Sequence, residues 1–148
     1  MRNRSNRQVR LKSRPVGIPQ AEHFEFVQMP VPAADRGQFV VRNRFLSVDP
    51  AMRGWVNAAA NYSQPVGIGE VMRSFAVGEV VESASADFKS GDWIVGMNAI
   101  EDYSLVRPEG FTMKIDPKAM PSVTNYLSVL GGPGLTAYFG LLEVGRPQ

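Results

Sequence analysis

The sequence predicts a mainly β domain of the small barrel or sandwich type, with a helix at its C-terminal end. Three observations support this class: short runs rich in β-branched and aromatic residues, glycine and proline turns between them, and helical periodicity confined to the end. The chain has 148 residues, of which 44% are hydrophobic and 20% charged. This length and composition suffice to bury a core without disulfides.

Seven short segments carry strand signals, and the turns between them are explicit. In the first, Val9 and Leu11 alternate with polar neighbours, and in the second, Phe24 and Phe26 share one face. Gly91 precedes a strand in "FKSGDWIVG", where a positive φ is easy only for glycine. The predicted strands are 8–12, 24–29, 38–48, 76–83, 92–97, 102–106 and 111–115.

Helical signals are fewer. A turn is expected near 50–56 and a helical segment near 122–130. The end of the chain, "GGPGLTAYFGLLEVGRPQ", has proline near its start and glycine near its end, which is the asymmetry of the two ends of a helix. Leu135, Tyr138 and Leu142 fall on one face of this predicted helix.

Composition excludes several chemistries. The chain has no cysteine and a single histidine, His23, so disulfides, a thiol nucleophile and a zinc site are not expected. No apolar run reaches the roughly 20 residues that a membrane span needs. We therefore expect a soluble, cytoplasmic protein without a membrane partner.

Basic residues are concentrated at the N-terminus. The first fourteen residues hold six of the sixteen basic residues and no acidic one. A nucleic-acid arm and a targeting segment are two interpretations. No aromatic residues interleave the basic ones, as base stacking would require, so a solvated terminus leading into the first strand is favoured. No nucleic-acid partner is expected.

Three motifs in a fixed order carry a family resemblance: "RFLSVDPAMRGWV" (44–56), "FKSGDWIVG" (88–96) and "LGGPGLTAYFGLLEVGRP" (130–147). With 7–19 and 78–83, they resemble the N-terminal half of the zinc-independent medium-chain dehydrogenases/reductases, the subgroup with prostaglandin reductase, alkenal double-bond reductases and curcumin reductase. The resemblance implies a partly open, GroES-like β-barrel. It implies a basic head and strand start at 1–14, a substrate domain at 15–130, and a helix at 131–148 leading to a Rossmann domain absent from this sequence.

The same resemblance implies an activity. Such enzymes use NADPH to reduce the C=C bond of α,β-unsaturated ketones and aldehydes without a metal ion. A homodimer of the full-length protein is one possible assembly, and the oligomeric state is left open. Hydride addition builds negative charge on the carbonyl oxygen, which needs a hydrogen-bond donor. The candidates are the ribose hydroxyl of the cofactor and Tyr62, which matches a tyrosine of the family; the alternative for Tyr62 is a loop residue with an exposed hydroxyl. Without the Rossmann domain, residues 1–148 are expected neither to bind NADP(H) tightly nor to turn over.

The resemblance also implies the remaining site residues. Phe45, Ala51, Tyr62 and Phe75 are expected in the substrate pocket, and Leu135 and Thr136 on the cofactor side. Ala51, Phe75 and Gly132 replace residues that are tyrosine, tyrosine and methionine in relatives, which leaves the substrate open.

Two charged residues and one rival function complete the prediction. Asp49 is interpreted as a cap of the turn that follows Pro50, rather than as a catalytic acid. Arg53 is interpreted as an anchor of this turn or a residue that reaches the domain interface, rather than as an anion site. A stand-alone β-barrel binding module without catalysis is the alternative function. Continuation of the reading frame into a glycine-rich phosphate loop would favour the enzyme.

Overall fold

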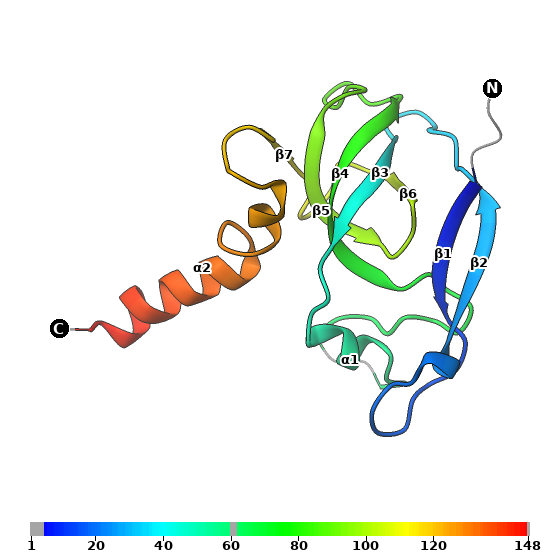
Figure 1. The fold of residues 1–148 in the computed structure, drawn as a ribbon, viewed down its shortest axis with the longest axis horizontal. Helices are drawn as coiled ribbons and strands as arrows, with labels where there is room; N and C mark the ends of the chain where they lie inside the picture. Colours follow the sequence, from blue (N-terminus) through cyan, green and yellow to red (C-terminus); the bar gives the residue numbers. More distant parts are fainter. Residues whose placement is uncertain (1–4, 60–61, 148) are drawn as a thin grey trace.

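The computed structural model describes residues 5–59 and 62–147 and shows two antiparallel sheets with short helices around them (Figure 1). The smaller sheet pairs two strands, and the larger has five in the order β6-β3-β4-β5-β7. The strands are β1 (Ser5–Leu11), β2 (Phe24–Pro30), β3 (Phe39–Leu46), β4 (Arg73–Ser83), β5 (Trp93–Ala99), β6 (Tyr103–Val106) and β7 (Met113–Ile115). The mainly β class and all seven predicted strands are confirmed.

The helices are short and lie between or after the strands. They are η1 (Ala21–His23), α1 (Ala51–Trp55), η2 (Val123–Leu127), α2 (Gly132–Phe139) and η3 (Gly140–Gly145). The predicted terminal helix is confirmed, but its second half, η3, is a π-helix, in which the amide of Arg146 donates to the carbonyl of Leu141 at 2.9 Å. Figure 1 shows α2 extending away from the sheets.

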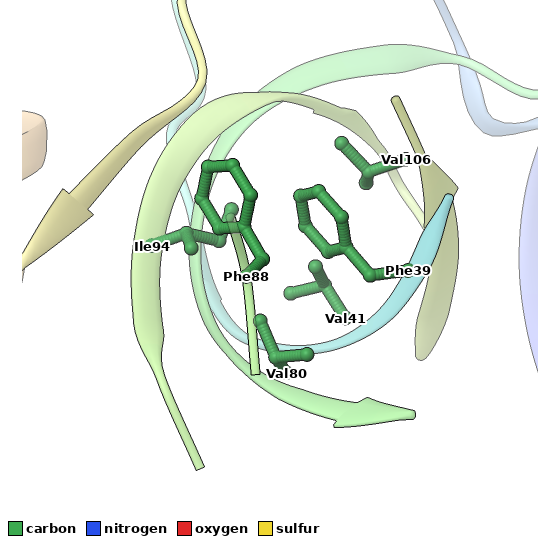
Figure 2. Packing of buried hydrophobic residues seen from close by; sticks show 6 residues of the cluster. All are labelled: Phe39, Val41, Val80, Phe88, Ile94 and Val106. Atoms are coloured by element: carbon green, nitrogen blue, oxygen red, sulfur yellow. The ribbon is translucent and has the colours of Figure 1, made fainter. Parts of the chain in front are cut away.

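The core of the larger sheet is a compact apolar cluster enclosed by its curved strands (Figure 2). Phe39 is fully buried and stacks on Phe88, with ring centroids 4.4 Å apart. The other members are Val41, Val80, Ile94 and Val106. Strand β3 supplies two of these residues because it lies in the interior of the sheet, between β4 and β6.

A second cluster lies where α1 meets the first strand. Leu11, Trp55 and Met72 are buried in it, together with Val56 and Val66. Arg14 holds this region from outside, because its guanidinium donates to the carbonyls of Val56, Asn57 and Val66 at 2.8–3.0 Å. Arg14 belongs to the predicted basic head, so this residue of the head has a structural contact.

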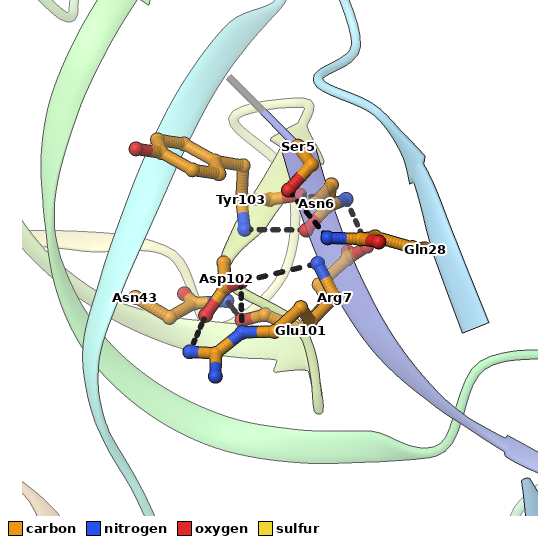
Figure 3. A network of polar contacts seen from close by, with 8 residues as sticks. All are labelled: Ser5, Asn6, Arg7, Gln28, Asn43, Glu101, Asp102 and Tyr103. Carbon is orange, nitrogen blue, oxygen red and sulfur yellow. Dashed lines mark hydrogen bonds and ion pairs between the residues drawn. The ribbon is translucent and has the colours of Figure 1, made fainter. Parts of the chain in front are cut away.

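The smaller sheet is tied to the larger one by polar groups of β1 (Figure 3). Asn6, which is 1% exposed, donates to the carboxylate of Glu101 and to the carbonyl of Tyr103, both at 2.8 Å. Arg7 forms an ion pair with Asp102 at 2.8 Å, and this hydrogen-bonded pair holds the pKa of Asp102 below its usual value. Arg7 and Arg10 of the predicted basic head thus lie within β1, whereas residues 1–4 of the head lie outside the described residues.

Candidate functional site

An apolar cavity of about 190 Å³ lies between the larger sheet and the segment that runs from η2 into α2. Phe75 of β4, Val95 of β5 and Met113 of β7 line the side of the sheet. The opposite side is formed by η2, α2 and the residues between them: Tyr126, Leu127, Leu130, Gly131, Gly132, Pro133 and Leu135. Largely apolar cavities with few polar groups are typical of small-molecule sites, so this is the candidate site.

The aromatic wall of the cavity is built from two segments. Phe75 lies on β4, opposite Met97 of β5, and its ring meets Phe111 edge to face with centroids 6.1 Å apart. Phe111 is 71% exposed and precedes β7. An apolar ligand in the cavity would therefore contact aromatic surface that is exposed to solvent in this structure.

Close backbone packing fixes the opposite wall. A side chain at Gly134 would place its Cβ 1.9 Å from the carbonyl oxygen of Val129, and one at Gly131 would lie 2.6 Å from that of Tyr126. Only glycine allows the start of α2 to approach the preceding turn this closely. At Gly132, by contrast, a Cβ would meet no atom within 4 Å. The "GGPG" string thus shapes the wall and leaves open space at Gly132.

Polar side chains in the cavity come from Ser47, Asp49 and Tyr126. The hydroxyl of Tyr126 donates to the carbonyl of Asp116 at 3.0 Å, so this hydrogen bond helps to stabilise the wall of the cavity. The Oδ2 atom of Asp49 is buried and has no hydrogen-bond partner among the described residues. The N-cap position of helix α1 is Pro50 and no side chain caps the helix, so Asp49 does not fill the capping role expected from the sequence.

Arg53 does fill its predicted anchoring role. Its Nε and Nη2 atoms donate to the carbonyl of Gly17 at 3.1 and 2.9 Å, and Nη1 donates to Asn57. These contacts fix α1 against the loop that follows β1.

Two of the site residues expected from the resemblance, Phe75 and Leu135, come together in the cavity. The other four lie elsewhere. Ala51 packs against the second apolar cluster, Phe45 is 46% exposed on β3, and Tyr62 is 79% exposed in the loop after α1. The hydroxyl of Thr136 donates to the carbonyl of Gly132 at 2.8 Å, within its own helix.

Sequence reasoning missed the wall residues of η2, and it did not place Asp49, which it assigned to a cap, beside Ser47 as a polar pair in the cavity. The pair had a usable signal: the residues stand two positions apart at the end of a strand run, where extended backbone directs both to one face. Within 5–59 and 62–147, no group of three or more potential metal ligands occurs. No helix in this described part is long and apolar enough to cross a membrane.

The fold is that of a β-rich domain with an apolar cavity, and its terminal helix forms part of one wall of this cavity. A family described as the N-terminal domain of oxidoreductase matches residues 7–114. The chain therefore belongs to this family and is the GroES-like N-terminal half of the medium-chain dehydrogenase/reductase fold, as the resemblance implied.

Comparisons with individual proteins support this assignment to the family. The chain is 41% identical over 143 residues to the NADPH-dependent curcumin reductase of Escherichia coli (strain K12), a match covering 97% of this chain and 41% of that protein. It is 34% identical over 149 residues to the NADP(+)-dependent 2-alkenal reductase of Nicotiana tabacum, covering 97% and 43%. The crystal structure of CurA in complex with NADPH from Vibrio vulnificus superposes with a TM-score of 0.87 at 39% identity, covering 96% and 42%. The chain thus spans about two fifths of the length of these relatives.

Proposed function

We propose that this chain forms the substrate-binding half of an NADP(H)-dependent oxidoreductase that reduces the C=C bond of α,β-unsaturated ketones or aldehydes without a metal ion. The observation that carries the proposal is the apolar cavity walled by Phe75 and Leu135. It suits the carbon skeleton of an enone, and related proteins are named for curcumin and alkenal reduction. In the complete protein a Rossmann domain would follow α2.

Two residues at the start of α2 are suited to contact the nicotinamide end of the cofactor. Leu135, in the first turn of α2, lines the cavity and offers an apolar surface to a flat ring. The hydroxyl of Thr136 already donates within α2, so it retains acceptor capacity for an amide donor. A bound nicotinamide cofactor would supply the hydride. The chain's own contribution is to hold the substrate and keep water from it.

The developing negative charge on the substrate oxygen requires a donor, and we propose Tyr62 for this role. Neutral tyrosine is a donor at neutral pH. The ring of Tyr62 is exposed in the loop after α1, outside the cavity as it stands. The role therefore requires the loop to approach the substrate in the complete protein. The ribose hydroxyl of the cofactor is the rival donor.

The test is NADPH oxidation by the full-length protein with enones and alkenals, using the saturated ketones as matched controls. We expect turnover of the unsaturated compounds alone, unaffected by a chelator, and no turnover by residues 1–148. Tyr62→Phe should lower kcat/KM about 100-fold or more if its hydroxyl is the donor. Unchanged kcat/KM removes Tyr62 from that role, and no NADPH oxidation with any enone refutes the proposed function.

A further inference from the structure

The cavity has a feature that the proposed function leaves unused, the exposed ring of Phe111. This residue lies in the loop between β6 and β7, directly after Gly110, whose φ of 62° is a conformation that glycine adopts easily. Phe111 is 71% exposed and lines the cavity, and Met113, two residues further on in β7, lines it as well. The loop therefore presents a large apolar side chain at the solvent-exposed side of the candidate site.

The rings of Phe111 and Phe75 form a corner in the cavity wall. Their planes are inclined by 75° and their centroids are 6.1 Å apart, and both residues line the same cavity. A third, flat ring in such a corner can stack on the face of one phenyl ring and meet the edge of the other, and these are the two arrangements that aromatic pairs prefer. An aliphatic ring has no π-system, so it gains only the burial of its surface.

The size of the cavity and the exposure of its aromatic residues also suit one aromatic ring. An apolar cavity of about 150 Å³ is large enough to take up benzene, and this cavity measures about 190 Å³. Three aromatic side chains line it, and Phe75 and Tyr126 are only partly exposed, whereas Phe111 is 71% exposed. A ring bound in the cavity would therefore remove more water from Phe111 than from the other two aromatic residues.

We propose that Phe111 is a specificity-determining residue that selects substrates carrying an aromatic ring, which contacts Phe111 and Phe75 together. The inference rests on the proposed function, because the ring is then a substituent on the C=C bond of an enone. Phe111 contacts this substituent and has no part in the hydride transfer. Its substitution should therefore change the discrimination between ligands and leave the turnover of an enone without a ring unchanged.

The experiment compares benzalacetone with its cyclohexyl analogue as ligands of the full-length protein. Dissociation constants are measured by calorimetry in the presence of NADP⁺, which cannot donate a hydride. If apolar area alone decided, the cyclohexyl compound would bind at least as tightly, because its ring buries no less apolar surface. We expect the wild type to bind benzalacetone about fivefold more tightly, which is the contribution of one aromatic contact. Phe111→Leu keeps an apolar side chain and should reduce this preference to about twofold or less, whereas Phe111→Tyr should retain it.

A matched control and a second substrate separate this role from general effects. Phe26→Leu changes a phenylalanine of β2 that is 84% exposed and lies outside the cavity, so it should keep the full preference. Equal affinities or no binding in the wild type would overturn the inference, as would a full preference in Phe111→Leu or its loss in Phe26→Leu. Turnover of methyl vinyl ketone, which has no ring, decides the proposed function separately. It should be equal in the wild type and Phe111→Leu, and its absence in the wild type refutes the proposed function while the binding comparison still tests Phe111.

Discussion

The five-stranded sheet buries its apolar side chains, whereas the α2–η3 segment leaves many of its own exposed. In the sheet, Phe39, Val41 and Ile94 are fully buried against one another. In α2–η3, Leu142 is 45% exposed and Val144 81%, and the segment extends away from the sheets (Figure 1). The sheet therefore has a core of its own, whereas the helix presents the kind of apolar surface that marks an interface. We therefore expect substitutions in the sheet core to lower the free energy of unfolding more than substitutions in α2–η3.

The largest loss of stability on substitution is expected in the core of the five-stranded sheet. Phe39→Ala removes a fully buried ring that stacks on Phe88 at 4.4 Å and leaves a cavity that rigid strands cannot close. We expect a loss of about 3–5 kcal/mol in the free energy of unfolding, measured by urea denaturation. A loss below about 1 kcal/mol would mean that the sheet does not depend on this cluster.

An intermediate effect is expected at the junction between the two regions. Gly134→Ala would force a Cβ against the backbone of Val129, so the start of α2 must shift. We expect about 1–3 kcal/mol of local destabilisation, seen as faster amide exchange in α2 with little change in the strands. Gly132→Ala is the matched control, because open space surrounds that position and alanine favours a helix. Equal exchange in both variants would contradict the close approach.

The smallest effect is expected on the exposed face of η3. Leu142→Ala should change the stability of residues 1–148 by less than about 0.5 kcal/mol, as at most surface positions. In the full-length protein, where we propose that a second domain follows, the same change should cost about 2 kcal/mol or more. Denaturation of both proteins, each with and without the substitution, measures the difference. An equal cost in the two contexts would show that this face is not covered.

Much of the sheet could be predicted because its signals are local. Alternation in β1 and the β-branched run of β3 identify strands within a few residues, and Gly91 adopts the predicted positive φ of 92°. The start of β4 at Arg73 was missed, since Arg73 and Ser74 have no strand propensity of their own. They join the strand because β5 pairs with them, which is a tertiary effect.

The site was harder to predict because it depends on distant segments meeting. Phe75 and Leu135 are sixty residues apart in sequence, and the resemblance, rather than any local pattern, assigned Phe75 to the substrate pocket and Leu135 to the cofactor side; both line the cavity. Asp49 was assigned to a cap because the following turn satisfies the local pattern for one. In the structure, its Oδ2 atom is buried without a hydrogen-bond partner among the described residues, which no local pattern predicts.

The polar link between β1 and the start of β6 has a consequence for how the chain folds. Asn6 reaches its acceptors on Glu101 and Tyr103 across 95 and 97 residues of sequence. The hairpin of β1 and β2 can form as soon as residue 30 has been synthesised, but the buried amide of Asn6 has no native partner until residue 101 has emerged. Closing so long a loop is entropically costly, and folds dominated by such contacts form in milliseconds to seconds. During synthesis on the ribosome, the side chain of Asn6 must therefore wait for two thirds of this chain before its native acceptors are available.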